Sequence, residues 1–181
     1  MSEVSGRVIL GVDPGTASTG FGVISVFGNR LEVLDYGVVQ TPSEAPLEQR
    51  LELIFNEITK ILERHRPAAA AVESLYFNTN VRTALAVGEA RGVALLACAQ
   101  VGCPVFEYTP QQVKQAVVGY GKAEKQQVME MVRVLLGMSE QPQPDHAADA
   151  LGVAICHANS SAFLERVKRN SSLQARRKTA R

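Results

Sequence analysis

The chain has 181 residues and a net charge of +1, with 46% hydrophobic and 20% charged side chains. These values are typical of a globular protein, and the length allows one sizeable core without requiring a second domain. The longest strongly apolar stretch, Val93–Ala99, is too short to cross a bilayer, and the first residues lack the basic and apolar regions of a signal peptide. We therefore expect a cytoplasmic protein.

The charge is distributed unevenly along the chain. Residues 165–181 carry seven basic and one acidic side chains, which leaves the remainder with a net charge of −5. An acidic body with a basic end can bind nucleic acid only through local patches and that end. We expect one domain over residues 1–160 and a basic, disordered tail over residues 161–181, which either contacts DNA or only aids solubility.

The three cysteines, Cys98, Cys103 and Cys156, include no CxxC pair. Their odd number and their spacing predict free thiols in a reducing cytoplasm. The same spacing argues against a zinc site.

The first predicted elements are three strands. Residues 8–12 form a short apolar run that ends on Asp13, and Pro14-Gly15 then makes a turn. The apolar pattern restarts twice, the second time over Leu31–Gln40, so the three strands form an antiparallel meander. Taken alone, Asp13 is more simply explained as a turn residue.

Two helices and a buried strand follow. The first helix is predicted over Pro46–Arg66, and apolar residues line one face of it at Leu47, Leu51, Ile54, Ile58 and Ile61. The apolar run Ala68–Glu73 predicts a central parallel strand that again finishes on a carboxylate. The second helix, Asn80–Ala99, has small residues on one face, which either packs within the chain or forms a subunit interface: Ala84, Gly88 and Gly92.

The C-terminal half alternates between a strand and helices. The strand is predicted over Pro104–Tyr108, followed by helices over residues 109–117, 124–136 and 145–158. The helix over residues 124–136 directs four apolar residues inward, Val128, Met131, Val132 and Leu135. This order predicts an α/β fold whose mixed five-stranded sheet has three antiparallel strands, then two parallel strands, flanked by helices.

Four side chains stand out as a candidate site: Asp13, Glu73, His146 and Asp149. Two carboxylates end strands, and His146 and Asp149 share one face of the last helix. Asp145 is a candidate N-cap of that helix. Carboxylates gathered together repel each other unless a cation neutralises them, and their oxygens suit Mg²⁺ or Mn²⁺. Two such ions per site support phosphoryl transfer, although each spacing alone is weak evidence.

Five segments resemble, in family order, the motifs of RuvC, the bacterial Holliday-junction resolvases of the RNase H-like superfamily. They are GVDPGTASTGFGV, VESLYF, ARGVA, VFEYTPQQVKQAVVGYGKAEKQQVMEMV and DHAADALGVAICH. The resemblance implies an RNase H-like fold and places Asp13, Glu73 and Asp149 on the family's catalytic, metal-binding carboxylates. His146 falls where the family carries an acid or a histidine, so it implies either a nitrogen ligand to the metal or a general base.

The resemblance further implies a homodimer that nicks four-way DNA junctions symmetrically in recombination and repair, leaving 5′-phosphate and 3′-hydroxyl ends. It implies partnership with the RuvA–RuvB branch-migration complex. Six residues are candidates for DNA binding: Tyr76 and Phe77, which would wedge or stack at the junction centre, and Arg82, Lys114, Lys122 and Lys125, which would contact phosphates. Core packing and ordinary solvated charges are the alternatives for these residues.

Three other functions are compatible with parts of the sequence. Asp13-Pro14-Gly15-Thr16 fits the first phosphate loop of an actin-like or sugar-kinase-like ATPase, but such folds need about twice this length and a second loop. A non-cleaving junction-binding protein would leave the carboxylates without a role. A general RNase H-like nuclease acting on RNA–DNA hybrids differs from a resolvase only in its substrate.

Overall fold

A computed structural model describes residues 6–74 and 81–161, with no side-chain detail at 81–83. Its centre is a five-stranded sheet in the order β3-β2-β1-β4-β5. The strands are β1 (Arg7–Asp13), β2 (Ser18–Phe27), β3 (Arg30–Gln40), β4 (Ala69–Glu73) and β5 (Val105–Tyr108). The first three pair antiparallel, whereas β4 runs parallel to β1 and β5 parallel to β4. The predicted mixed sheet is confirmed.

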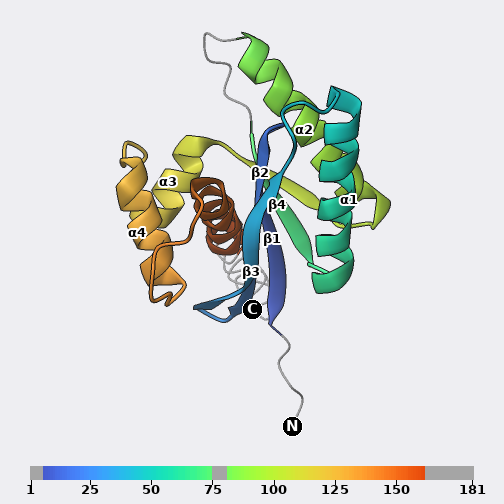
Figure 1. Cartoon of the computed structure of the whole chain (residues 1–181). Helices are drawn as coiled ribbons and strands as arrows, with labels where there is room; N and C mark the ends of the chain where they lie inside the picture. Colours follow the sequence, from blue (N-terminus) through green and yellow to red (C-terminus); the bar gives the residue numbers. More distant parts are fainter. Residues whose placement is uncertain (1–5, 75–80, 162–181) are drawn as a thin grey trace, which may run out of the picture.

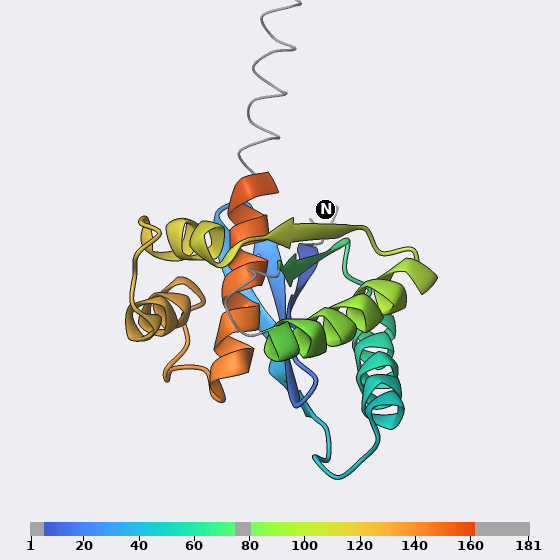
Figure 2. The same cartoon turned by 90° about the horizontal axis from the view of Figure 1, so that it is seen from above.

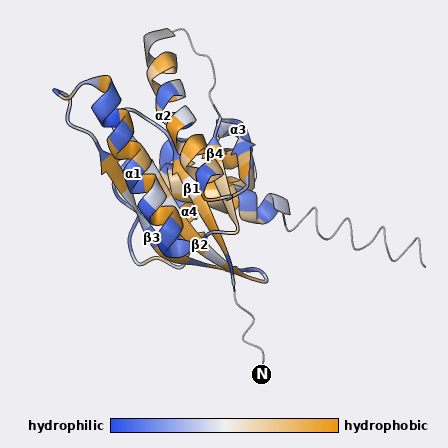
Figure 3. Ribbon diagram, turned by 90° about the vertical axis from the view of Figure 1, so that its right-hand side faces the viewer, coloured by the Kyte–Doolittle hydropathy of each residue, from blue (hydrophilic) through white to orange (hydrophobic). Residues whose placement is uncertain are grey.

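Helices cover both faces of the sheet (Figures 1 and 2). On one face lie α1 (Leu47–His65) and α2 (Val81–Gln100). On the other lies a helix over residues 145–161, which we call the 145–161 helix, with α3 (Pro110–Val118) and α4 (Lys125–Leu135) outside it. Figure 3 shows largely hydrophobic strands and a largely hydrophilic outward face of α1. Among the described helices, none has the length and apolar character that crossing a bilayer requires.

Local signals in the sequence explain where the helices begin and end. Arg66 adopts a left-handed conformation and Pro67 follows it, so α1 stops there as predicted. The Thr109 side chain accepts a hydrogen bond from the backbone of Gln112, and the Gln112 side chain accepts one from the Thr109 backbone, which forms a capping box at α3. At the start of α4, the Gln127 side chain likewise accepts a hydrogen bond from the backbone N–H of Glu124.

Two expected core positions are wrong, both near helix ends. Leu47 is 41% exposed, because burial along the inner face of α1 becomes complete only at Ile54. Leu135 is 38% exposed, and Leu136, where α4 has ended, takes the inward position instead. The helical period is correct in both cases, but the first or last turn does not face the core.

The outer face of α2 is open in the single chain. Its buried side is made by Ala90, Ala94, Ala97 and Cys98. Gly92 is exposed, and a Cβ added there would meet nothing within 4 Å. Leu85 and Leu96 on the exposed side are 63% and 52% accessible. Gly92 therefore does not serve packing within this chain.

Glycines on the sheet bring the 145–161 helix unusually close. Gly11 pairs with Gly22 across β1 and β2, and Asp13 pairs with Gly20. A Cβ at Gly11 would overlap the carbonyl oxygen of Ala150, and one at Gly20 would overlap the carbonyl oxygen of His146. These glycines therefore allow the helix backbone to rest directly on the strands, which sets the position of its first two turns relative to Asp13.

Candidate metal and catalytic site

Two carboxylates lie side by side at one end of the central strands. Val12 of β1 pairs with Val72 of the parallel strand β4, so the next residues, Asp13 and Glu73, leave the sheet at the same edge. Both are partly buried. The pairing of β1 with β4 therefore brings the two acids together.

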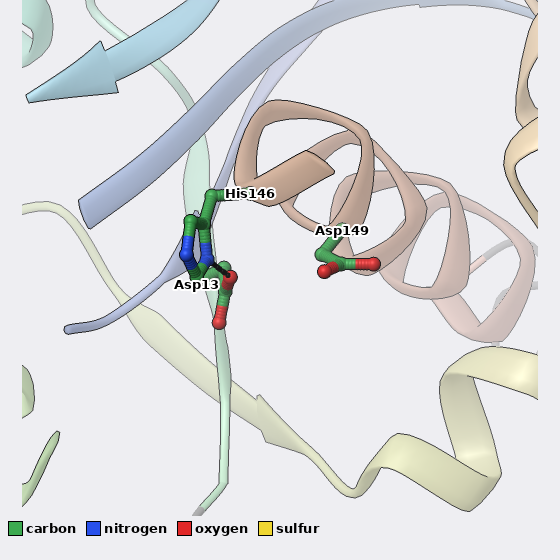
Figure 4. A group of neighbouring side chains, drawn as sticks. All are labelled: Asp13, His146 and Asp149. Atoms are coloured by element: carbon green, nitrogen blue, oxygen red, sulfur yellow. Dashed lines mark hydrogen bonds and ion pairs between the residues drawn. The ribbon is translucent and has the colours of Figure 1, made fainter. Parts of the chain in front are cut away.

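The 145–161 helix adds the other two predicted side chains. His146 Nδ1 lies 2.7 Å from Asp13 Oδ2, and Asp149 follows one turn later on the same helix (Figure 4). Ligand atoms of Asp13, His146 and Asp149 all lie within 4.8 Å of one another. A hydrogen bond between the side chains of Glu73 and Asp13 connects the fourth residue to this cluster.

The carboxylates of the cluster are partly buried, and their negative charge is compensated only in part, by Lys125. Burial, followed by the charges of Asp13 and Asp149, raises the pKa of Glu73 to about 8. Burial also raises the pKa of Asp13, partly opposed by its hydrogen bond with His146. A divalent cation would relieve this repulsion, and the donor set of carboxylate oxygens and an imidazole suits Mg²⁺ or Mn²⁺. The residues present therefore fit a divalent metal.

Asp145 is not the N-cap of the helix. The backbone N–H groups of Ala147 and Ala148 donate to the Pro144 carbonyl, so Asp145 lies within the first turn. Its carboxylate instead lies 3.1 Å from the Nζ of Lys125, which is also 3.2 Å from Asp149. Sequence reasoning treated Lys125 only as a phosphate contact and missed its ion pair with a predicted ligand, because α4 is far from Asp149 in sequence.

The remaining DNA-binding candidates differ in where they lie. Lys114 and Lys125 line a pocket of about 180 Å³ beside Glu73 and Asp149. Lys122 is exposed between α3 and α4. Tyr76 and Phe77 lie outside the described residues, and Arg82 belongs to α2, but its side chain lies outside the described part.

The sheet order, the carboxylates at the ends of its central strands and the acidic helix packed against it define an RNase H-like nuclease fold. A family model described as crossover junction endodeoxyribonuclease RuvC matches residues 9–157. The chain belongs to the RuvC family.

Individual relatives agree with this assignment. The RuvC of Heliobacterium modesticaldum is 60% identical over 153 residues, which cover 84% of this chain and 94% of the relative. That of Desulfitobacterium hafniense is 54% identical over 160 residues, or 88% and 97% of the two chains. The Thermus thermophilus RuvC, solved in complex with a Holliday junction substrate, superposes with a TM-score of 0.83 at 40% identity, covering 87% and 96%.

Proposed function

We propose that this protein resolves four-way DNA junctions by metal-dependent hydrolysis of phosphodiester bonds, giving paired nicks with 5′-phosphate and 3′-hydroxyl ends. The observation that carries the proposal is the convergence of Asp13, Glu73, His146 and Asp149 at one end of the central strands. Membership of the RuvC family supports the choice of a junction as substrate.

The four side chains of the cluster would have two different roles in the reaction, metal binding and proton transfer. Asp13, Glu73 and Asp149 would hold two Mg²⁺ or Mn²⁺ ions, which activate water and stabilise the leaving oxygen when bound. We assign His146 the role of base for the attacking water, because its ring is half exposed and is held by its hydrogen bond to Asp13. Ligation of an ion by the same ring is the other role open to it.

Basic and aromatic residues would bind the junction. Lys114 and Lys125 adjoin the carboxylates, where they would contact the phosphates on either side of the scissile bond, and Lys122 and Arg82 would extend this contact. Tyr76 and Phe77 would stack at the opened centre of the junction.

We further propose that residues 1–160 form one nuclease domain and that a basic tail follows it. We also propose that the protein acts together with a RuvA–RuvB motor.

The open face of α2 would form a homodimer, which suits a nearly twofold substrate. We expect Leu96→Glu to raise the dimer dissociation constant about 30-fold or more, because it places a charge in the centre of an apolar contact. Light scattering after size exclusion measures this. Leu34→Glu, on a similarly exposed leucine of β3, should leave the dimer intact. A wild-type monomer, or an unchanged Leu96→Glu dimer, would contradict this interface.

Metal binding should depend on pH through Glu73. In the folded, metal-free protein the pKa of Glu73 is about 8, compared with 4.5 for the unperturbed group. The fold therefore favours protonated Glu73. Its contribution to stability is fully present below pH 4.5 and is lost as the pH rises to about 8. Metal binds the deprotonated carboxylate. The rise in melting temperature caused by Mg²⁺ should therefore be larger at about pH 8 than at about pH 5. Glu73→Gln should abolish the difference, and equal shifts in the wild type would refute it.

A cleavage assay tests the proposed function itself. A labelled synthetic four-way junction with a mobile core, a matched linear duplex and an RNA–DNA hybrid are each incubated with Mg²⁺, Mn²⁺ or EDTA. We expect symmetric, metal-dependent nicks in the junction alone. Binding without cutting under any ion would indicate a non-cleaving junction-binding protein, and cutting of the hybrid alone would indicate a different nuclease.

A further inference from the structure

Two of the three cysteines meet where α2 ends, at the opposite end of the sheet from the carboxylates. Gly102 has a φ of 70° and donates its N–H to the carbonyl of Ala99, while the N–H of Cys103 donates to the carbonyl of Cys98. This is a Schellman motif, in which the side chains at these two positions pack together. Here both are thiols, and the Cys103 thiol also lies within 3.6 Å of the Pro67 carbonyl oxygen and 3.8 Å of the Pro104 carbonyl oxygen.

The two thiols differ in access and acidity. Cys98 is fully buried, whereas Cys103 is 8% exposed and lines a surface pocket of about 380 Å³ together with Arg66 and Pro67. The interaction between the two thiol groups lowers the pKa of Cys103 and raises the pKa of Cys98. A cysteine that borders a surface pocket, with a lowered pKa and a buried thiol packed beside it, is the arrangement of an attacking and a resolving cysteine.

We propose that Cys98 and Cys103 form a redox-active dithiol that a hydroperoxide converts to an intrachain disulfide. The Cys103 thiolate attacks the terminal peroxide oxygen, the O–O bond breaks, and the departing alkoxide or hydroxide takes the proton that Cys103 released. The Cys98 sulfur then attacks the resulting sulfenic acid, the S–O bond breaks, and hydroxide leaves with the Cys98 proton as water. Two thiols are oxidised, one peroxide is reduced, and the product joins the end of α2 to the segment leading into β5.

Cys156 provides an internal control. It lies in the core cluster on the other face of the sheet, and burial raises the pKa of its thiol to about 11. Cys156 also borders a pocket, of about 390 Å³, but it is only 1% exposed and no second thiol lies beside it among the described residues. We therefore expect it to stay reduced under conditions that oxidise the other two.

Mass spectrometry of the full chain after hydrogen peroxide treatment tests the proposal without requiring any junction activity. We expect loss of two hydrogen atoms, a peptide joining Cys98 to Cys103, and full reversal by dithiothreitol. Cys98→Ser should leave a sulfenic acid at Cys103 that dimedone captures, Cys103→Ser should abolish oxidation, and Cys156→Ser should change nothing. Three intact thiols at a peroxide dose that oxidises glutathione, a disulfide between two chains, or a sulfenic acid at Cys98 would each overturn it.

Discussion

Asp13→Asn and Asp149→Asn should each reduce the rate of junction cleavage about 10³-fold or more while leaving junction affinity within about threefold. Cleavage falls because each change removes several kcal/mol of metal-dependent stabilisation of the transition state. Binding remains because the basic residues that contact DNA are unchanged. Both carboxylates belong to the cluster whose ligand atoms lie within 4.8 Å of one another. Removing either negative charge would lower the affinity of the site for the divalent ions that the reaction needs. Binding is measured in Ca²⁺ or EDTA by gel shift, and cleavage by single-turnover kinetics in Mg²⁺.

The matched control makes the same chemical change away from the site. Asp35 lies on β3, where His65 and Arg64 pair with it. Asp35→Asn should cut at the wild-type rate. If Asp13→Asn or Asp149→Asn also did so, the carboxylates would have no catalytic role, and the assignment of the site would be wrong. A mutant that loses binding and cutting together would show that the carboxylate supports the fold or the DNA contact instead.

Gly11→Ala should destabilise the protein by about 3 kcal/mol, the upper part of the usual range for an overpacked core. The added methyl group would overlap the Ala150 carbonyl and crowd Ala154 on the 145–161 helix. Because both obstacles include backbone atoms, the helix itself must move away from β1. Asp149 would move with it, so we expect cleavage to fall more steeply than the folded fraction does. Urea unfolding and cleavage at a temperature where the variant remains folded measure the two effects.

Gly92→Ala separates this steric effect from the general effect of adding a methyl group. Gly92 lies within α2 with open space around its Cα, so alanine should stabilise the helix by about 1 kcal/mol. Protein concentration is held equal because the same face is proposed to form the dimer. If Gly11→Ala were as stable as the wild type, the close approach of the helix to the sheet would not be required.

Local sequence was sufficient for most of the fold. The apolar runs ending on Asp13 and Glu73 became neighbouring parallel strands, and the Thr109 and Pro67 signals bounded α3 and α1 as predicted. These features depend on hydrogen bonds and backbone preferences within a few residues, which a sequence pattern records directly. The pairing of His146 with Asp149 on one helix face is equally local, since it follows from the helical repeat.

The sequence by itself therefore determined the order of the strands and helices, and it determined which charged side chains lie at the ends of these elements. Only the tertiary structure decided that Lys125 pairs with Asp149, that Leu135 faces solvent, and that Gly11 and Gly20 form the surface on which the 145–161 helix rests. Each of these depends on how two elements distant in sequence are positioned against each other. That positioning is set by steric fit across the whole core, and no local periodicity encodes it.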